Sequence, residues 1–152
     1  MSVVQQPSCD AAAAVRAEAR ARLKGHGLLC CTQGRLGLLV LLSASERHLS
    51  PAEVCEELAL SGHAVDPTTV YRALDALTAA GLVHAVHGPR PARYGISGEP
   101  HHHTVCRECG SVAGLSSRHL TEAVDRLAEL TGLRPDAEGA LLIYGRCTRC
   151  TV

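Results

Sequence analysis

The sequence predicts an α+β protein in two parts: a helical N-terminal part that ends in two short strands, and a smaller C-terminal part that mixes strands with a helix. Three observations predict this class. Ser50 and Asp66 are each followed by proline, which makes both strong helix starts. Two short β-prone segments, residues 82–86 and 93–96, flank a turn-rich stretch. Beyond them, a strand and helix pattern accompanies two Cys-x-x-Cys pairs.

Length and sequence pattern narrow the class of protein. At 152 residues the chain holds one larger domain or two small ones, with room for a core but not for a large enzyme cleft. We expect no signal peptide, because the N-terminus lacks a charged segment followed by an apolar one. The longest apolar run, residues 36–42, is too short to span a bilayer. We therefore expect a cytoplasmic protein without a membrane partner, in which thiols stay reduced and available to metals.

Composition favours metal chemistry over bulk attraction to nucleic acid. The 15 Lys and Arg residues balance 15 Asp and Glu residues, so any DNA binding must come from local placement of charge. Aromatic residues make up only 2%, which disfavours a single-strand binder that stacks bases. The 8 cysteines and 9 histidines are a heavy load of metal ligands for this length.

The N-terminal part is expected to form four helices. They cover residues 11–24, from 32 to about 44, from 50 to 62, and 68–80. Thr32, Ser50 and Asp66 supply the N-caps of the last three, and glycines follow each expected end except that near residue 44. Cys30 and Cys31 are adjacent, which suits neither a disulfide nor shared ligation, so we interpret both as packing residues.

The fourth helix separates apolar from polar side chains. Val70, Leu74 and Leu77 fall on one face at i, i+4 and i+7, which suits burial. The opposite face carries Thr68, Tyr71, Arg72, Asp75 and Ala79. A short helix, a turn and such a helix predict a helix-turn-helix DNA reader, while an ordinary amphipathic helix fits the same pattern.

The first helix carries a basic row. Arg16, Arg20 and Lys24 fall at i, i+4 and i+8, so they share one face. Such a row is either a solvated face or a phosphate-contacting face, and the pattern alone leaves both interpretations open.

The C-terminal part is expected to hold three strands and one helix. The strands cover residues 101–105, 111–115 and 140–144. Ser116 or Ser117 is expected to cap the helix, whose inward side chains would be Leu120, Val124, Leu127 and Leu130. We expect two domains: 1–97 with a loose tail over 1–10, and 98–152 with a hinge over 98–100. The second domain is small, so zinc and a partner subunit would both stabilise it.

Four cysteines form the clearest ligand set in the sequence. Cys106-Arg-Glu-Cys109 and Cys147-Thr-Arg-Cys150 are two knuckles, and Gly110 relieves backbone crowding after the first. Two such pairs, far apart in an intracellular-looking chain, favour a closed structural zinc site. Two redox pairs or two disulfides are the alternative interpretation.

Taken in order, these residues resemble the ferric-uptake-regulator (Fur) family of metal-sensing bacterial repressors. Five stretches match: residues 27–35, 48–53, 69–74, 101–110 and 144–150. The strongest match is the run from His101 to His103 together with the first knuckle. Thr69-Val-Tyr71-Arg72 is similar to the family's recognition-helix signature. The resemblance covers nearly the whole chain.

The resemblance implies a winged-helix domain joined to a small α/β dimerisation domain. It implies a homodimer that binds a palindromic operator in double-stranded DNA when metal occupies a sensor site, and so a regulator rather than an enzyme. The expected DNA-binding residues are Thr68, Thr69, Tyr71, Arg72, Arg35 and Arg16. The four knuckle cysteines would hold structural zinc.

Histidines around the hinge are the expected sensor ligands. Because side chains alternate along a strand, His101 and His103 share a face and His102 points away. The resemblance places further sensor positions in the N-terminal part. The expected set is His48, His84, His101 and His103, with His87 as the alternative to His84. Each N-terminal histidine, taken singly, also fits an ordinary exposed or packed residue.

The expected sensor departs from the commonest ligand patterns of the resembled family. Iron-sensing members usually place Glu, and peroxide-sensing members Asp, where this chain has Gly95. Zinc-sensing members often have Cys nearby, where this chain offers Ile96 or Ser97. A histidine-rich site suits zinc, nickel, copper and iron. We expect zinc as the regulatory ion, with nickel next and ferrous iron third.

Further metal and redox roles also follow from the resemblance and the motifs. A third family site would use His102 and Glu122, with Gly139 near its missing histidine. A zinc hydrolase needs an open coordination position and a His-Glu-x-x-His motif, which this chain lacks. A thiol-based redox switch at the knuckles is the alternative type of regulator.

Overall fold

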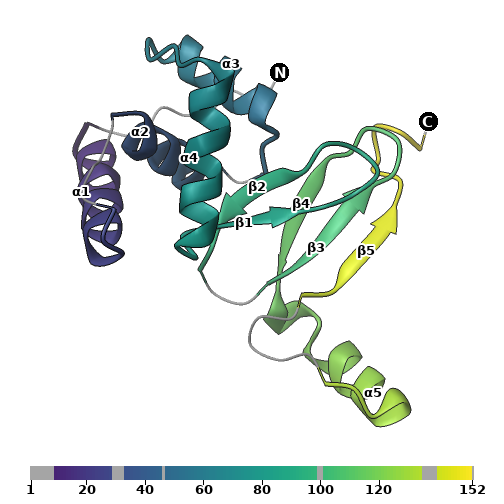
Figure 1. Cartoon of the computed structure of the whole chain (residues 1–152). Helices are drawn as coiled ribbons and strands as arrows, with labels where there is room; N and C mark the ends of the chain where they lie inside the picture. Colours follow the sequence, from purple (N-terminus) through teal and green to yellow (C-terminus); the bar gives the residue numbers. More distant parts are fainter. Residues whose placement is uncertain (1–8, 29–32, 46, 99–100, 135–139, 152) are drawn as a thin grey trace.

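The computed structural model describes residues 9–28, 33–45, 47–98, 101–134 and 140–151, and it confirms the α+β class. The N-terminal part contains α1 Cys9–Gly25, α2 Gln33–Ala44, α3 Pro51–Leu60, α4 Pro67–Ala79, β1 Val83–Val86 and β2 Arg93–Ile96. The C-terminal part contains β3 His101–Cys106, β4 Val112–Ser116, a short 3₁₀ turn, α5 Thr121–Thr131 and β5 Leu142–Gly145 (Figure 1). The boundary at 97/98 stays a prediction. Thr32, Cys30, Cys31, Gly139 and most of the expected hinge lie outside the described residues.

Local caps explain the helices that lead to α4. Ser50 accepts a hydrogen bond from the Glu53 backbone N–H, and the Glu53 carboxylate accepts one from the Ser50 N–H. Asp66 caps α4 in the same way, by accepting from the Thr69 N–H. Each cap of this kind stabilises a helix by about 1 kcal/mol. Gly81, with φ 69°, then turns the chain from α4 into the wing, which is the antiparallel hairpin of β1 and β2.

The N-terminal core forms around the apolar face of α4. Val70, Leu74 and Leu77 are each 1% exposed or less and pack in one cluster with buried residues of α1, α2 and α3. Burial of this face leaves the opposite face of α4, which includes Tyr71, in solvent. No helix within the described ranges is long and apolar enough to cross a membrane.

The C-terminal sheet has the strand order β4-β3-β5. β3 pairs antiparallel with β4 and parallel with β5, and Cys106 lies opposite Gly145 in the parallel register. Because β3 and β5 run parallel, their C-terminal ends lie at the same edge of the sheet. The two Cys-x-x-Cys turns follow at that edge.

The start of α5 differs from the sequence-based prediction. Neither Ser116 nor Ser117 caps the helix: residues Ser117–His119 form a 3₁₀ turn, Leu120 takes the N-cap position, and no side chain caps it. The Leu120 N–H donates to the Ser117 carbonyl, which closes this extra turn. The helix therefore begins at Thr121.

The prediction that one face of α5 is buried is also wrong for the single chain. Leu127 is 44% exposed and Leu130 is 68% exposed, and none of the helix residues is buried. α5 extends away from the sheet, so no other described element covers it (Figure 1). Leu142 and Ile143 of β5 are exposed as well.

The two parts of the chain meet along the wing (Figure 1). Val86 of β1 forms a small buried cluster with Val105 and Val112 of the C-terminal sheet. At the wing tip, Arg90 Nη2 donates to the Glu108 carbonyl at 2.7 Å. Gly110, with φ 71°, leaves room for this contact, because a Cβ there would lie 2.5 Å from Arg90 Cγ. These contacts place β1 beside β3.

Candidate metal centres

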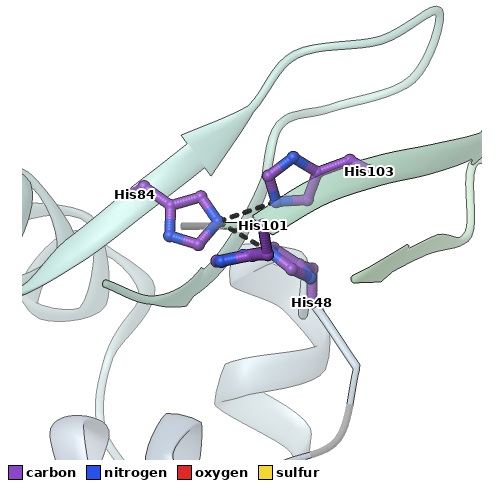
Figure 2. Close-up of side chains that lie close together, drawn as sticks. All are labelled: His48, His84, His101 and His103. Atoms are coloured by element: carbon purple, nitrogen blue, oxygen red, sulfur yellow. Dashed lines mark hydrogen bonds between the residues drawn. The ribbon is translucent and has the colours of Figure 1, made fainter. Parts of the chain in front are cut away.

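Four histidines converge where the two parts of the chain meet (Figure 2). His48 comes from the loop between α2 and α3, His84 from β1, and His101 and His103 from β3. One ring nitrogen of each lies within 4.8 Å of those of the others. His84 Nε2 is 2.8 Å from His48 Nε2 and 3.0 Å from His103 Nε2.

The alternation of β3 accounts for its two contributions. His101 and His103 point to the same side of the strand, and their ring centroids lie 4.6 Å apart. His102 points away, where its Nδ1 accepts a hydrogen bond from the Leu141 N–H at 3.1 Å. The predicted sharing of one face by His101 and His103 is therefore confirmed.

The surroundings favour the neutral form of three of these rings, those of His48, His84 and His103. Burial, followed by repulsion from the neighbouring rings and Arg93, lowers the pKa of His48 to about 3. Burial and then the facing His101 and His84 lower the pKa of His103 to about 4, and burial likewise lowers the pKa of His84. Each neutral ring presents one nitrogen lone pair.

The contacts between ring nitrogens fit a shared cation. His84 Nε2 touches two other Nε2 atoms, but a neutral ring has only one proton to donate, and that proton serves one contact at most. A positive ion between converging lone pairs removes this conflict. Among the described residues the group contains no carboxylate, so its donor set suits zinc, nickel, copper or iron rather than magnesium or calcium.

Four cysteines form the second group. The Sγ atoms of Cys106, Cys109, Cys147 and Cys150 lie within 4.8 Å of one another. All four are free thiols, and Cys109 Sγ is 3.8 Å from Cys147 Sγ. The parallel pairing of β3 with β5 brings the two knuckles together, as the spacing predicted.

The thiol pKa values reflect how closely the four sulfurs crowd. Backbone N–H groups of Cys109 and Cys147 lower the pKa of Cys106 to about 6. The thiol of Cys147, followed by burial, raises the pKa of Cys150 to about 12, because a further thiolate would face the others. A divalent cation would balance these charges, and four thiolates are the ligand set of a closed structural zinc site.

The remaining predicted site residues lie outside both groups. Of the two wing alternatives, His84 joins the cluster, whereas His87 is exposed and its carbonyl accepts from the Tyr144 hydroxyl at 3.4 Å. His102 and Glu122 belong to neither group, so the third site stays a prediction.

The predicted DNA-binding residues differ in exposure. Tyr71 is 52% exposed, and Arg72, Thr68 and Arg16 are exposed as well. The Thr69 hydroxyl donates to the carboxylate of Asp66, so it already serves the cap of α4. Arg35 is half-buried.

One supporting residue was not predicted from the sequence. Arg93 forms an ion pair with Glu53 and donates to the His48 carbonyl at 3.2 Å, so it holds the backbone of a cluster residue. Its spacing carries no motif, and only the bridge between Leu49 and Tyr94 of β2, just before α3, brings the three residues together. An arginine on the inward-facing side of a short strand is the one sequence signal that could have indicated it.

Comparison with known proteins identifies the relatives of the chain. Residues 27–137 match the Ferric uptake regulator family. The ferric uptake regulation protein of Neisseria meningitidis serogroup A is 34% identical over 133 residues, which cover 86% of this chain and 91% of that protein. The zinc uptake regulation protein of Mycobacterium tuberculosis is 31% identical over 122 residues, which cover 78% of this chain and 92% of that protein.

A solved structure agrees with these relationships. The Vibrio cholerae ferric uptake regulator matches with a TM-score of 0.67 at 29% identity, over 82% of this chain and 96% of that chain. The family match spans most of the chain, and the relatives include both ferric and zinc uptake regulators, none of which is an enzyme. With its four-cysteine and four-histidine groups, this chain is a member of the ferric uptake regulator family of metal-responsive transcriptional regulators.

Proposed function

We propose that the chain is a zinc-responsive repressor, a homodimer that binds a palindromic DNA operator and controls genes for uptake or storage of zinc. The structural zinc ligands would be Cys106, Cys109, Cys147 and Cys150. The sensor ligands would be His48, His84, His101 and His103. The observation that carries the proposal is the position of the histidine group, which draws ligands from both parts of the chain.

Because the four histidines come from both parts of the chain, an ion bound to them would couple the N-terminal and the C-terminal part. His48 and His84 belong to the part that contains α4, while His101 and His103 lie on the strand that leads into the four cysteines. A bound ion would supply a positive centre for the four lone pairs. The imidazoles would then hold β3 against β1. Part of the free energy of ion binding would thereby favour one orientation of α4 relative to the C-terminal part.

The exposed face of α4 is the proposed DNA reader. Arg72 offers a charge for a phosphate, and Tyr71 and Thr68 offer groups for base edges. Arg16 on α1 adds a phosphate contact outside the reader helix. A two-fold dimer would set two α4 helices about one turn of DNA apart, which requires a palindromic site.

The proposed dimer contact is the apolar surface of the C-terminal part. Leu127, Leu130 and Leu133 are exposed in the single chain, and so are Leu142 and Ile143 of β5. Exposed apolar surface of this kind is stabilised when it is buried against a second copy.

Zinc is proposed over the other ions because of the donors, and zinc as well as ferric uptake regulators are among the relatives. Four imidazole ligands match zinc and nickel, whereas iron sites in proteins also draw on carboxylates, which are absent from the group among the described residues. The Mycobacterium tuberculosis relative is a zinc uptake regulator. Nickel and then ferrous iron are the alternatives.

Selection of DNA from a random duplex library tests the proposal. The protein, holding only its structural zinc, is incubated at buffered free zinc, nickel or, without oxygen, ferrous iron. We expect enrichment of an inverted repeat at a lower free concentration of zinc than of the other ions. Equal affinity for the selected site after a chelator has removed all but the structural zinc would contradict the sensor function.

A thiol switch is the second candidate function. Cys109 is exposed and its Sγ lies 3.8 Å from that of Cys147, so a disulfide could form between the knuckles if the ion is lost. Release of zinc by mild peroxide with a matching loss of operator affinity would support this function. Unchanged affinity at full oxidation of the four thiols would exclude it.

A further inference from the structure

We propose that Arg90, at the tip of the wing, is a positioning residue for the histidine group: it organises the group for ion binding although it lies outside it. The inference rests on the proposed sensor function and names a residue on which the ion affinity of that site depends. The wing carries one ligand of the group, His84 on β1, and its tip contacts the turn between Cys106 and Cys109.

Arg90 is anchored on this turn by its guanidinium group and by its side-chain stem. Its Nη2 atom donates to the Glu108 carbonyl at 2.7 Å. Its Cγ and Cβ lie over Gly110, where an added Cβ would come within 2.5 Å and 2.7 Å of them. The Glu108 carboxylate pairs at 2.9 Å with Arg146, which directly precedes the second knuckle. The residue that Arg90 contacts is therefore tied to both Cys-x-x-Cys pairs.

The wing tip reaches this anchor with little conformational freedom to lose. Pro89 and Pro91 flank Arg90, and each proline fixes its own backbone φ. Gly88 lies so close to the sheet that a Cβ on it would be 3.2 Å from Val105 Cγ1. The gap that remains between the wing and the sheet has no room for a water molecule. The hydrogen bond of Arg90 therefore completes a closely fitted contact, and ordering the tip costs little entropy.

The two histidines of the N-terminal part are both fixed to the wing. His84 lies in β1 itself. His48 lies against β2, because the neighbouring Leu49 exchanges two backbone hydrogen bonds with Tyr94, at 3.0 Å and 2.8 Å. The His48 ring fills the space beside Gly95, where an added Cβ would lie 2.4 Å from its Nε2 atom. A displacement of the hairpin therefore moves both imidazoles together relative to the two on β3.

Ion affinity depends on how much of the time these two pairs of imidazoles face each other. The four ligand nitrogens lie within 4.8 Å of one another when the wing is docked on the sheet as described. If the docked arrangement is populated for only a fraction of the time, the apparent dissociation constant rises by the inverse of that fraction. One hydrogen bond from a charged donor shifts such an equilibrium by about fivefold. Loss of Arg90 thus weakens ion binding while all four ligands remain.

The test measures binding of the second ion by protein that retains its structural zinc. Zinc affinity is obtained by competition with a chromophoric chelator, and the visible spectrum of bound cobalt reports the ligands. We expect Arg90→Ala to weaken zinc binding by about fivefold and to leave the cobalt spectrum at saturation unchanged, because no ligand is lost. His84→Ala, which removes a ligand, should weaken binding and also alter the spectrum.

Arg149→Ala is the matched control. Arg149 lies within the second Cys-x-x-Cys pair and is exposed, so its replacement removes the same charge near the same four cysteines. Among the described residues it has no hydrogen bond or ion pair with the wing. Its variant should bind the second zinc ion as the wild type does. Equal losses in Arg149→Ala and Arg90→Ala would reduce the effect to charge and overturn the inference.

Other outcomes separate this inference from the proposed function. Full zinc affinity in Arg90→Ala, or a cobalt spectrum altered as in His84→Ala, would overturn the inference and leave the sensor function standing. A wild-type chain that takes up no second ion would overturn both. Because Arg90 is exposed, Arg90→Ala should keep the structural zinc and the thermal midpoint of the wild type. Loss of the structural zinc in this variant would overturn the positioning role and show that Arg90 supports the knuckle instead.

Discussion

Arg93 of β2 and Glu53 of α3 form an ion pair directly beside the backbone of His48. The same guanidinium group of Arg93 donates to the His48 carbonyl at 3.2 Å, and Glu53 also pairs with Arg47. The carboxylate that caps α3 therefore also fixes the arginine that holds the histidine loop. Glu53 of the helix cap and His48 of the histidine group are therefore joined through the Arg93 side chain.

The Glu53 carboxylate makes stability depend on pH. Partial burial opposes its ionisation, but the Ser50 N–H, Arg47, the Ser50 hydroxyl and Arg93 outweigh burial and lower its pKa to about 2, from an ordinary 4.5. Because the folded pKa is depressed, the stabilisation is present above about pH 4.5 and is lost as the pH falls toward 2. Glu53→Gln should lower the free energy of unfolding at neutral pH by about 2 kcal/mol. In urea titrations the difference from the wild type should shrink between pH 5 and pH 3; a constant difference would contradict this.

Replacing one knuckle cysteine should unfold the C-terminal part. Cys147→Ser removes one of four thiolates, and structural zinc contributes about 10 kcal/mol in small zinc domains. We expect loss of the structural zinc and of β-sheet signal, measured by zinc content and circular dichroism. Cys55→Ser is the control, because Cys55 is half-buried on α3 and outside the group. Equal zinc content in the two variants would show that Cys147 is not a ligand.

Replacing both β3 ligands should separate sensing from folding. His101→Ala with His103→Ala removes two of four imidazoles, so operator affinity should no longer respond to free zinc. The structural zinc and the thermal midpoint should stay close to those of the wild type. His87→Ala is the control, since His87 is exposed and lies outside the cluster. Collapse of the double variant would instead indicate that these histidines are structural.

The outer face of α4 should carry DNA affinity. Tyr71→Ala with Arg72→Ala removes an exposed ring and an exposed charge, and we expect a loss of about 2 kcal/mol or more in operator binding. The slope of log affinity against log salt should fall by about one, because one phosphate contact is lost. Fluorescence anisotropy at several salt concentrations measures both quantities. Arg118→Ala, also exposed but outside α4, should leave the slope unchanged.

The exposed leucines of α5 should hold the dimer together. Leu127→Glu with Leu130→Glu places charges on an apolar face that only a second chain could cover, so we expect monomers in sedimentation experiments. Leu60→Glu is the matched control, since Leu60 of α3 is 83% exposed and lies in the other part of the chain. A dimer that survives both α5 substitutions would place the subunit contact elsewhere.

Local signals explain what the sequence predicted well. Ser50 and Asp66 cap their helices through backbone contacts within three residues, so their patterns were sufficient to place α3 and α4. The two-residue period of β3 likewise placed His101 and His103 on one side. The cysteine spacing indicated the knuckles because two sulfurs three residues apart reach one ion without help from the rest of the fold.

Long-range packing explains what the sequence did not predict. The space beside Gly95 exists only because β2 lies against the loop that carries His48. The contact of Arg93 with the His48 carbonyl spans 45 positions and has no local pattern. The 3₁₀ turn before α5 follows from a backbone bond to Ser117 rather than from a serine side chain, so the capping rule predicted the wrong start.

The contact of Arg90 with the Glu108 carbonyl, beside Gly110, has a mechanical consequence. Glu108 lies in the loop that carries Cys106 and Cys109, so the tip of the wing contacts the cysteine-bearing turn. The β1 strand of the wing contacts the histidine group through His84. The part that contains α4 is thus supported at two places of different chemistry. In the proposed function, a change in thiol state and a change in ion supply would act on opposite ends of the same hairpin.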